Sequence, residues 1–167
     1  RLHGRSRAAF RAELEDSRKL LQDHSGQRVV GYRAPTFSVM PETRWAIDQL
    51  AEAGYEYDAS IFPVRHPAYG VPTAPLTPFV VRGGEAGPTM LELPPLTWRA
   101  MGRHIPVAGG GYFRLLPLGL MRRGLRQAAR EGRPAVLYFH PWEFDPDMPR
   151  MPLKLTGRIR TYTGLRS

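Results

Sequence analysis

The stretch Ala135-Val136-Leu137-Tyr138-Phe139-His140-Pro141-Trp142-Glu143 decides the fold that the sequence predicts. It is a short apolar run that ends abruptly in a histidine, and Pro141 stops any continuation. The residues before it, Glu131-Gly132-Arg133-Pro134, are typical of a helix end. An apolar run of this length between glycine and proline signals predicts a buried strand. His140 would then lie at the carboxyl end of that strand, where α/β folds place their chemistry.

Upstream of this stretch the chain alternates predicted helices and strands. One helix is expected from the N-cap Ser6 to Gly26, a second from Pro41 to Gly54, and a third ending at Gly132. The predicted strands cover residues 29–32, 55–62 and 136–139. Strands alternating with helices predict parallel βα units, whose carboxyl ends share one rim of the sheet. Three polar side chains at these ends are therefore expected to converge, namely Arg33, Asp58 and His140.

Residues 63–111 interrupt this alternation. Eight prolines fall between Pro63 and Pro95, and proline in a helix interior removes a donor and clashes with the preceding turn. Only short β-like pieces are expected here, at 79–81 and 90–93. We predict one α/β domain over residues 1–167, with 63–111 as an irregular insertion.

The bulk composition excludes some classes of protein. No run of 18 apolar residues occurs among the 167, so no transmembrane segment is predicted, and the absence of cysteine excludes disulfides and thiolate metal sites. The net charge of +9 is compatible with a nucleic-acid binder or with solvated arginine-rich helix faces. The spread-out charges and the lack of a nucleic-acid-reading motif favour solvated faces, so no nucleic-acid partner is expected. A basic surface also suits an anionic polysaccharide.

The three rim residues suit acid–base hydrolysis. A histidine can act as general acid or base at neutral pH, an arginine can hold a carboxylate or an anion, and an aspartate can orient the imidazole. Each also has a structural alternative. His140 could bond to backbone at a strand end, Arg33 could be a surface residue, and Asp58 could cap a turn.

Several strings resemble one protein family. Arg33-Ala34-Pro35 within residues 31–38 is similar to the Arg-x-Pro motif of the polysaccharide deacetylases, the NodB-homology carbohydrate esterases, and residues 136–140 are similar to their late strand–histidine motif. Residues 57–66, 109–114 and 138–146 resemble the exosortase-associated branch from bacterial exopolysaccharide loci. The resemblance covers nearly the whole chain.

The resemblance implies a partial, deformed (β/α) barrel and a reaction. The reaction is metal-dependent removal of acetyl from N-acetylhexosamine units of a polysaccharide, with a divalent ion, usually zinc, that polarises the carbonyl. His140 would protonate the departing amine, Arg33 would orient the catalytic carboxylate, and the backbone N–H of Thr36 would help to hold the oxyanion. Asp58 lies near the family's fourth motif, whose acid orients the late histidine. The Asp-Trp ending of that motif is missing, and Glu92 could do the same work.

Aromatic side chains near the expected rim have two interpretations. They could stack on sugar faces or pack in the core. The candidates for sugar contact are Phe37, Tyr112, Phe113 and Trp142.

The family's Asp-Asp and His-x-x-x-His motifs, which supply the base and the protein ligands of the metal, do not occur in this sequence. The chain thus resembles the C-terminal two-thirds of a deacetylase. We expect the chain alone to bind no metal and to be inactive, with the ion belonging to the full-length enzyme. The alternatives are a non-catalytic carbohydrate-binding remnant of the same fold and a basic nucleic-acid binder.

Overall fold

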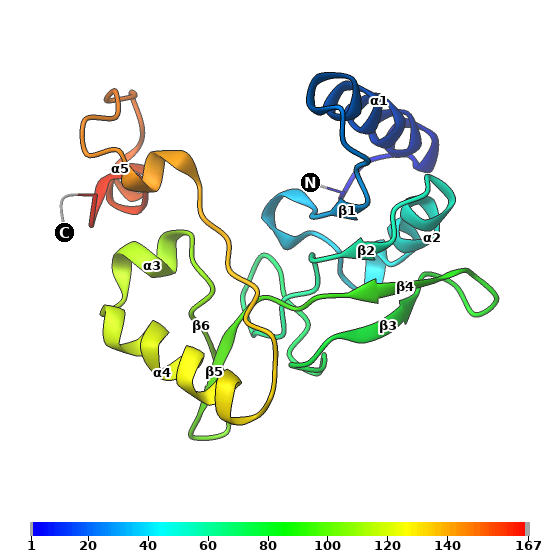
Figure 1. The fold of residues 1–167 in the computed structure, drawn as a ribbon. Helices are drawn as coiled ribbons and strands as arrows, with labels where there is room; N and C mark the ends of the chain where they lie inside the picture. The colour runs from blue at the N-terminus through cyan, green and yellow to red at the C-terminus, as the bar shows by residue number, and fades with distance from the viewer. Residues whose placement is uncertain (1, 166–167) are drawn as a thin grey trace. The chain divides into compact units, whose positions relative to one another are not determined.

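The computed structural model describes residues 2–165 and divides into two compact units, Arg1–Pro95 and Leu96–Ser167 (Figure 1). Both units are mixed α/β, and the described residues form a four-stranded sheet and a two-stranded sheet but no closed barrel. The partial barrel and the single domain both stay predictions. Within residues 2–165, no helix combines the length and apolarity needed to cross a bilayer.

The first unit begins with α1 (Arg7–Ser25), and the predicted caps of this helix are confirmed. The Ser6 side chain accepts a hydrogen bond from the Ala9 N–H, and Gly26 ends the helix in the left-handed region, with φ 65°. The second helix, α2 (Trp45–Glu52), starts later than predicted, because Pro41 opens the separate 3₁₀ turn η2 (Pro41–Thr43).

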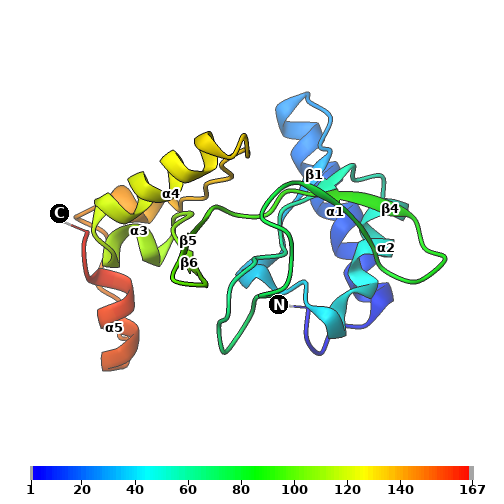
Figure 2. The ribbon, with the colours of Figure 1, turned by 90° about the horizontal axis from the view of Figure 1, so that it is seen from below.

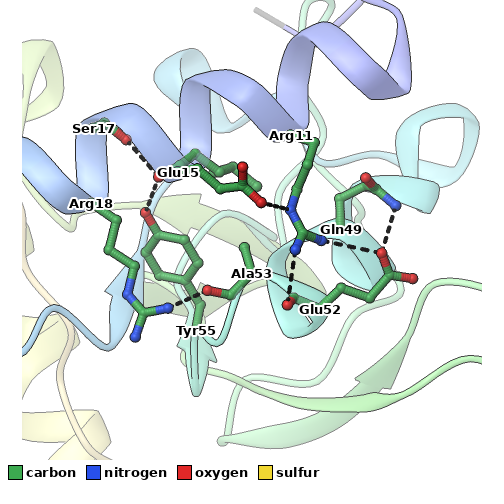
Figure 3. A network of polar contacts seen from close by, with 9 residues as sticks. Arg11, Glu15, Ser17, Arg18, Gln49, Glu52, Ala53 and Tyr55 are labelled. Atoms are coloured by element: carbon green, nitrogen blue, oxygen red, sulfur yellow. Dashed lines mark hydrogen bonds and ion pairs between the residues drawn. The ribbon is translucent and has the colours of Figure 1, made fainter.

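A network of polar contacts joins α1 to α2 and to the segment that follows (Figure 3). Arg11 on α1 contacts Glu52 at the end of α2, with 3.2 Å between the guanidinium and the carboxylate. Arg18 donates to the carbonyl oxygen of Ala53, and the Tyr55 hydroxyl donates to the Leu14 carbonyl at 3.3 Å. Each contact satisfies a backbone or charged group at a helix surface, so the two helices are fixed side by side.

The sheet of the first unit has the order β1-β2-β4-β3. Its strands are β1 (Gly31–Tyr32), β2 (Tyr57–Asp58), β3 (Phe79–Arg82) and β4 (Thr89–Glu92). β1, β2 and β4 are parallel, as the predicted βα units require, and β3 is antiparallel to β4. Asp58 and Glu92 are register partners at the carboxyl ends of β2 and β4.

The first two strands are shorter than predicted because side chains take their backbone groups. The Val29 N–H donates to Gln22 Oε1, and the Val29 carbonyl accepts from Arg18. The Ile61 N–H likewise donates to Glu92 Oε1 rather than to a neighbouring strand. The ladder therefore begins after Val29 and ends before Ile61.

The core of the first unit lies between the helices and the sheet, since α1 and α2 lie on the same side of it (Figures 1 and 2). Phe10 and Leu14 of α1 and Leu50 of α2 belong to this core, with Val81 and Met90 from the sheet. Apolar residues at helical spacing on α1 and α2 thus bury the faces that the sequence predicted.

The second unit contains the hairpin β5 (Thr97–Ala100) and β6 (Arg103–Pro106) and four helical segments. These are α3 (Gly111–Leu115), α4 (Leu118–Arg130), η3 (Pro141–Phe144) and α5 (Leu155–Tyr162). The predicted third helix, which ends at Gly132, corresponds to α4, and the short helix α3 before it was not predicted. Leu116 between them is extended, with ψ 147°, because the residue before Pro117 disfavours the helical conformation.

The prediction of a buried strand over 135–139 is wrong. In residues 2–165 this segment makes isolated bridges at Val136 and at Tyr138, the latter parallel with Gly109, and no ladder. Its backbone bonds are single contacts, such as Leu96 N–H to the Val136 carbonyl, and the Phe139 side chain is exposed. Val136, Leu137 and Tyr138 are half-buried. His140 consequently begins the 3₁₀ turn η3 instead of ending a sheet strand.

Candidate functional site

The predicted site residues are divided between the two units. Arg33, Thr36, Phe37 and Asp58 lie in the first unit, whereas Tyr112, Phe113, His140 and Trp142 lie in the second. The convergence of Arg33, Asp58 and His140 in one cavity therefore stays a prediction. Each unit nevertheless brings some of these residues together with partners that the sequence did not indicate.

In the first unit, the loop after β1 has an unusual backbone. Thr36 has φ 60° and ψ 25°, and Phe37 has φ 51°. A β-branched residue in the left-handed region is rare, and such strain persists only where surrounding contacts hold it. The side chains of Arg33 and Thr36 are exposed. Phe37, in contrast, is buried, and its ring centroid lies 4.9 Å from that of Phe62, which favours core packing over sugar contact.

Hydrogen bonds hold this loop at both ends. At its start, the Ala34 N–H donates to Ser60 Oγ at 2.7 Å, and Ser60 Oγ donates to Asp58 Oδ1 at 2.5 Å. At its end, Ser38 Oγ donates to the Pro35 carbonyl at 2.9 Å, and Thr43 Oγ1 donates to the Ser38 carbonyl at 2.7 Å. The positive-φ residues lie between these two anchors.

The first anchor ends in a pair of buried carboxyl groups. Asp58 and Glu92 are register partners and are both 0% exposed, and Glu92 Oε1 accepts from the Ile61 N–H at 2.9 Å. Asp58 Oδ2 and Glu92 Oε2 are buried without a hydrogen-bond partner. Burial raises the pKa of Asp58. Burial, with the neighbouring Asp58 charge, raises the pKa of Glu92 further, to about 10. The raised pKa of Glu92 favours its protonated form at neutral pH.

In the second unit, His140 forms a partly exposed ring pair with Trp142. The two ring centroids are 4.2 Å apart and the planes differ by 25°. The His140 side chain is 43% exposed and Trp142 is 44% exposed, so both rings are open to a ligand. Nδ1 of His140 is buried and lies 3.6 Å from Glu143 Oε1. The exposed edge of the imidazole is thus the one that carries Nε2.

Two buried side chains, Glu143 and Arg114, lie beneath the His140–Trp142 ring pair and support it. Glu143 Oε2 accepts from the His140 backbone N–H at 3.0 Å, and Oε1 lies 3.7 Å from Arg114 Nε. Their side chains are 2% and 5% exposed. Arg114 also donates to the carbonyls of Thr161 and Thr163 at 3.1 and 2.8 Å. Sequence analysis missed both residues, although the three-residue spacing from His140 to a glutamate is the signal of a capping box.

The other predicted aromatic residues are half-buried. Phe113 packs edge-on against Phe139, with centroids 5.1 Å apart, and also lies against Phe144. Tyr112 is half-buried in the same short helix, α3. Of the four candidates for sugar contact, Trp142 has the most accessible ring.

The donor groups do not fit the divalent ion that the resemblance implies. Residues 2–165 contain no cluster of three or more histidine, cysteine, aspartate or glutamate side chains. The buried neighbours Asp58 and Glu92 both have a raised pKa, which favours protonation, whereas a metal requires deprotonated ligands. We therefore assign no metal ligand in this chain.

Comparison with known proteins gives one match. A family model described as a domain of unknown function, DUF3473, matches residues 59–167, which is more than half of the chain. The match covers the whole second unit, including His140, Trp142 and Glu143. No curated protein and no solved structure matches the chain.

Proposed function

The chain belongs to the DUF3473 family, and we propose that it takes part in hydrolytic N-deacetylation of N-acetylhexosamine units in a bacterial exopolysaccharide. DUF3473 is associated with the C-terminal regions of polysaccharide deacetylases. The Arg-x-Pro string at Arg33 and the histidine string at His140 support the same reaction. The observation that carries the proposal is the exposed His140 ring, stacked on Trp142 and backed by Glu143.

In this proposal His140 is the general acid. Its exposed edge donates a proton to the amine as the amide carbon–nitrogen bond breaks, and the amino sugar leaves neutral. The Glu143 carboxylate behind Nδ1 stabilises the positive charge on the imidazolium before that transfer. Because Glu143 also binds the His140 N–H, one side chain fixes both the backbone and the ring of the acid.

Trp142 supplies the contact with the sugar. An exposed indole presents an apolar face on which a hexose ring can stack, and its neighbour His140 would then lie beside the substituents of that ring. The divalent ion of the family's reaction is not assigned to residues of this chain.

A second candidate is carbohydrate binding without catalysis. It is favoured by the exposed indole together with a donor set that does not fit a metal. Under this candidate the same surface binds polysaccharide but no acetate is released.

Acetate release from partly acetylated glucosamine polymer tests the proposal, using the full-length protein that carries this domain. We expect His140→Ala to lower kcat by about 100-fold or more, as for loss of a general acid. His24→Ala is the matched control, because His24 is an exposed histidine on α1 that bonds the Leu20 carbonyl. Full activity of His140→Ala would refute the role of His140 as the general acid. Retention on the polymer with no acetate released by any form would select the binding candidate.

A further inference from the structure

We propose that Glu92 is a positioning residue for the loop 34–38, which it holds as a neutral acid through Asp58 and Ser60. This inference rests on the proposed function, together with the oxyanion role that the family resemblance implies for the Thr36 N–H of that loop. Glu92 touches no substrate in this scheme. It acts through two other side chains.

The loop needs such support because its conformation is costly. Residues other than glycine that are held at positive φ are strained, and Thr36 and Phe37 are two consecutive residues of this kind, with φ 60° and 51°. The direction of the Thr36 N–H depends on this backbone. A loop that relaxed to ordinary dihedral angles would turn that donor away.

Buried contacts link Glu92 to the start of the loop. Glu92 is the register partner of Asp58, and Glu92 Oε2 and Asp58 Oδ2 are both buried without another hydrogen-bond partner, so one proton held between the two acids would satisfy both. Asp58 Oδ1 accepts from Ser60 Oγ, Ser60 Oγ accepts from the Ala34 N–H, and the Ile61 N–H donates to Glu92 Oε1. Every member is buried, so the loss of a bond would leave a polar group unsatisfied.

The proton on Glu92 is the essential part of these contacts. If both acids were ionised, two adjacent buried charges would repel each other and the bond between them would be lost. The titratable groups that act on the pair within the described residues are the two acids themselves and Tyr32 of β1, whose own pKa is raised by burial and by Asp58. The arrangement of the loop should therefore fail at alkaline pH.

Amide resonances of Ala34 and Thr36 in the ¹⁵N-labelled protein test the inference without any substrate. Glu92→Gln keeps a neutral donor for Asp58 and an acceptor for Ile61, whereas Glu92→Leu removes both. We expect the wild-type resonances to move as pH rises through the raised pKa of Glu92, about 10, those of Glu92→Gln to stay fixed over the same range, and those of Glu92→Leu to be displaced throughout. Glu56→Gln, at an exposed glutamate paired with Arg28, should behave as wild type.

Two results would overturn the inference. Wild-type resonances in Glu92→Leu would show that Glu92 does not position the loop, and equal displacement in Glu92→Gln would show that proton donation is not what matters. If Glu92→Leu does not fold, the pH response of wild type decides, because an Ala34 resonance that stays fixed while Glu92 ionises would show that Glu92 does not hold the loop.

The activity assay then separates this inference from the proposed function. Where acetate release is measurable, Glu92→Leu should lower kcat by up to about 100-fold with little change in KM. Glu92→Gln should have a kcat close to that of the wild type. If no form releases acetate but the resonances respond as expected, the proposed function fails while the positioning of the loop stands.

Discussion

At the scale of single residues, Glu143 is the side chain on which the geometry of His140 depends. We expect Glu143→Ala to destabilise the protein by about 3–5 kcal/mol, because it leaves the buried Arg114 charge without its carboxylate. Glu143→Gln should cost less, since it keeps an acceptor for the His140 N–H. Urea unfolding gives these differences.

Glu15→Ala is the control for that measurement, because the Glu15 carboxylate is 58% exposed and pairs with Arg11 at the surface. Exposed pairs of this kind contribute about 0–1 kcal/mol. If Glu143→Ala were no more destabilising than Glu15→Ala, the buried ion pair would not hold the second unit together.

The Ser6 cap and the Asp58–Glu92 pair show which contacts local sequence can and cannot predict. Ser6 was predicted as a cap because its signal lies within three residues of the helix that it starts. The partnership of Asp58 with Glu92 depends on the register of two strands that are far apart in the chain. Sequence analysis gave both acids the same task of orienting His140, whereas the structure joins them to each other.

At the scale of secondary-structure elements, two glycines in α4 form a matched pair. A Cβ at Gly124 would lie 2.6 Å from Val107 Cγ2, whereas a Cβ at Gly119 would meet nothing within 4 Å. We expect Gly124→Ala to destabilise the protein by about 1–3 kcal/mol through overpacking against the hairpin side. Gly119→Ala should be neutral or stabilising by up to about 1 kcal/mol, because alanine has the higher helix propensity.

Thermal unfolding of the two variants measures this difference directly. Equal stabilisation of both would mean that α4 does not pack closely over Val107. The experiment also tests the placement of α4 in the second unit independently of any function.

Helices were predictable where the spacing of apolar residues along one face shows which side chains are buried. α1 and α2 follow from the spacing of Phe10, Leu14 and Leu50. The segment 135–139 was not, because an apolar run does not say whether neighbouring strands exist to pair with it. Its bonds to Leu96 and Ala108 are tertiary contacts that no local pattern contains.

At the scale of the whole molecule, the boundary of the two compact units falls after Pro95, inside the stretch that the sequence marked as irregular. Prolines and glycines there predicted a break in the βα alternation. They did not predict that β4 would join the parallel sheet of the first unit and so bring Glu92 beside Asp58. Because two buried carboxyl groups then lie side by side, we expect the stability of the molecule to depend on the protonation of one of them.

Stability should therefore fall as pH rises above the usual range of carboxyl groups. Glu92 has its pKa raised by burial to about 10, so between the ordinary glutamate value of about 4.3 and this value the folded state binds a proton that the unfolded state releases. The free energy of unfolding then decreases with pH, by at most about 1.4 kcal/mol per pH unit for one proton.

Denaturant unfolding from about pH 6 to about pH 9 measures this slope, and Glu92→Gln removes its cause, because the amide does not ionise in this range. All other titratable groups are common to both proteins, so the difference between the two curves isolates Glu92. The difference should grow with pH in favour of Glu92→Gln, while Glu56→Gln, at an exposed acid, should run parallel to wild type. Parallel curves for wild type and Glu92→Gln would mean that Glu92 is already ionised in the folded protein, and the acid pair would then have to be held by a cation.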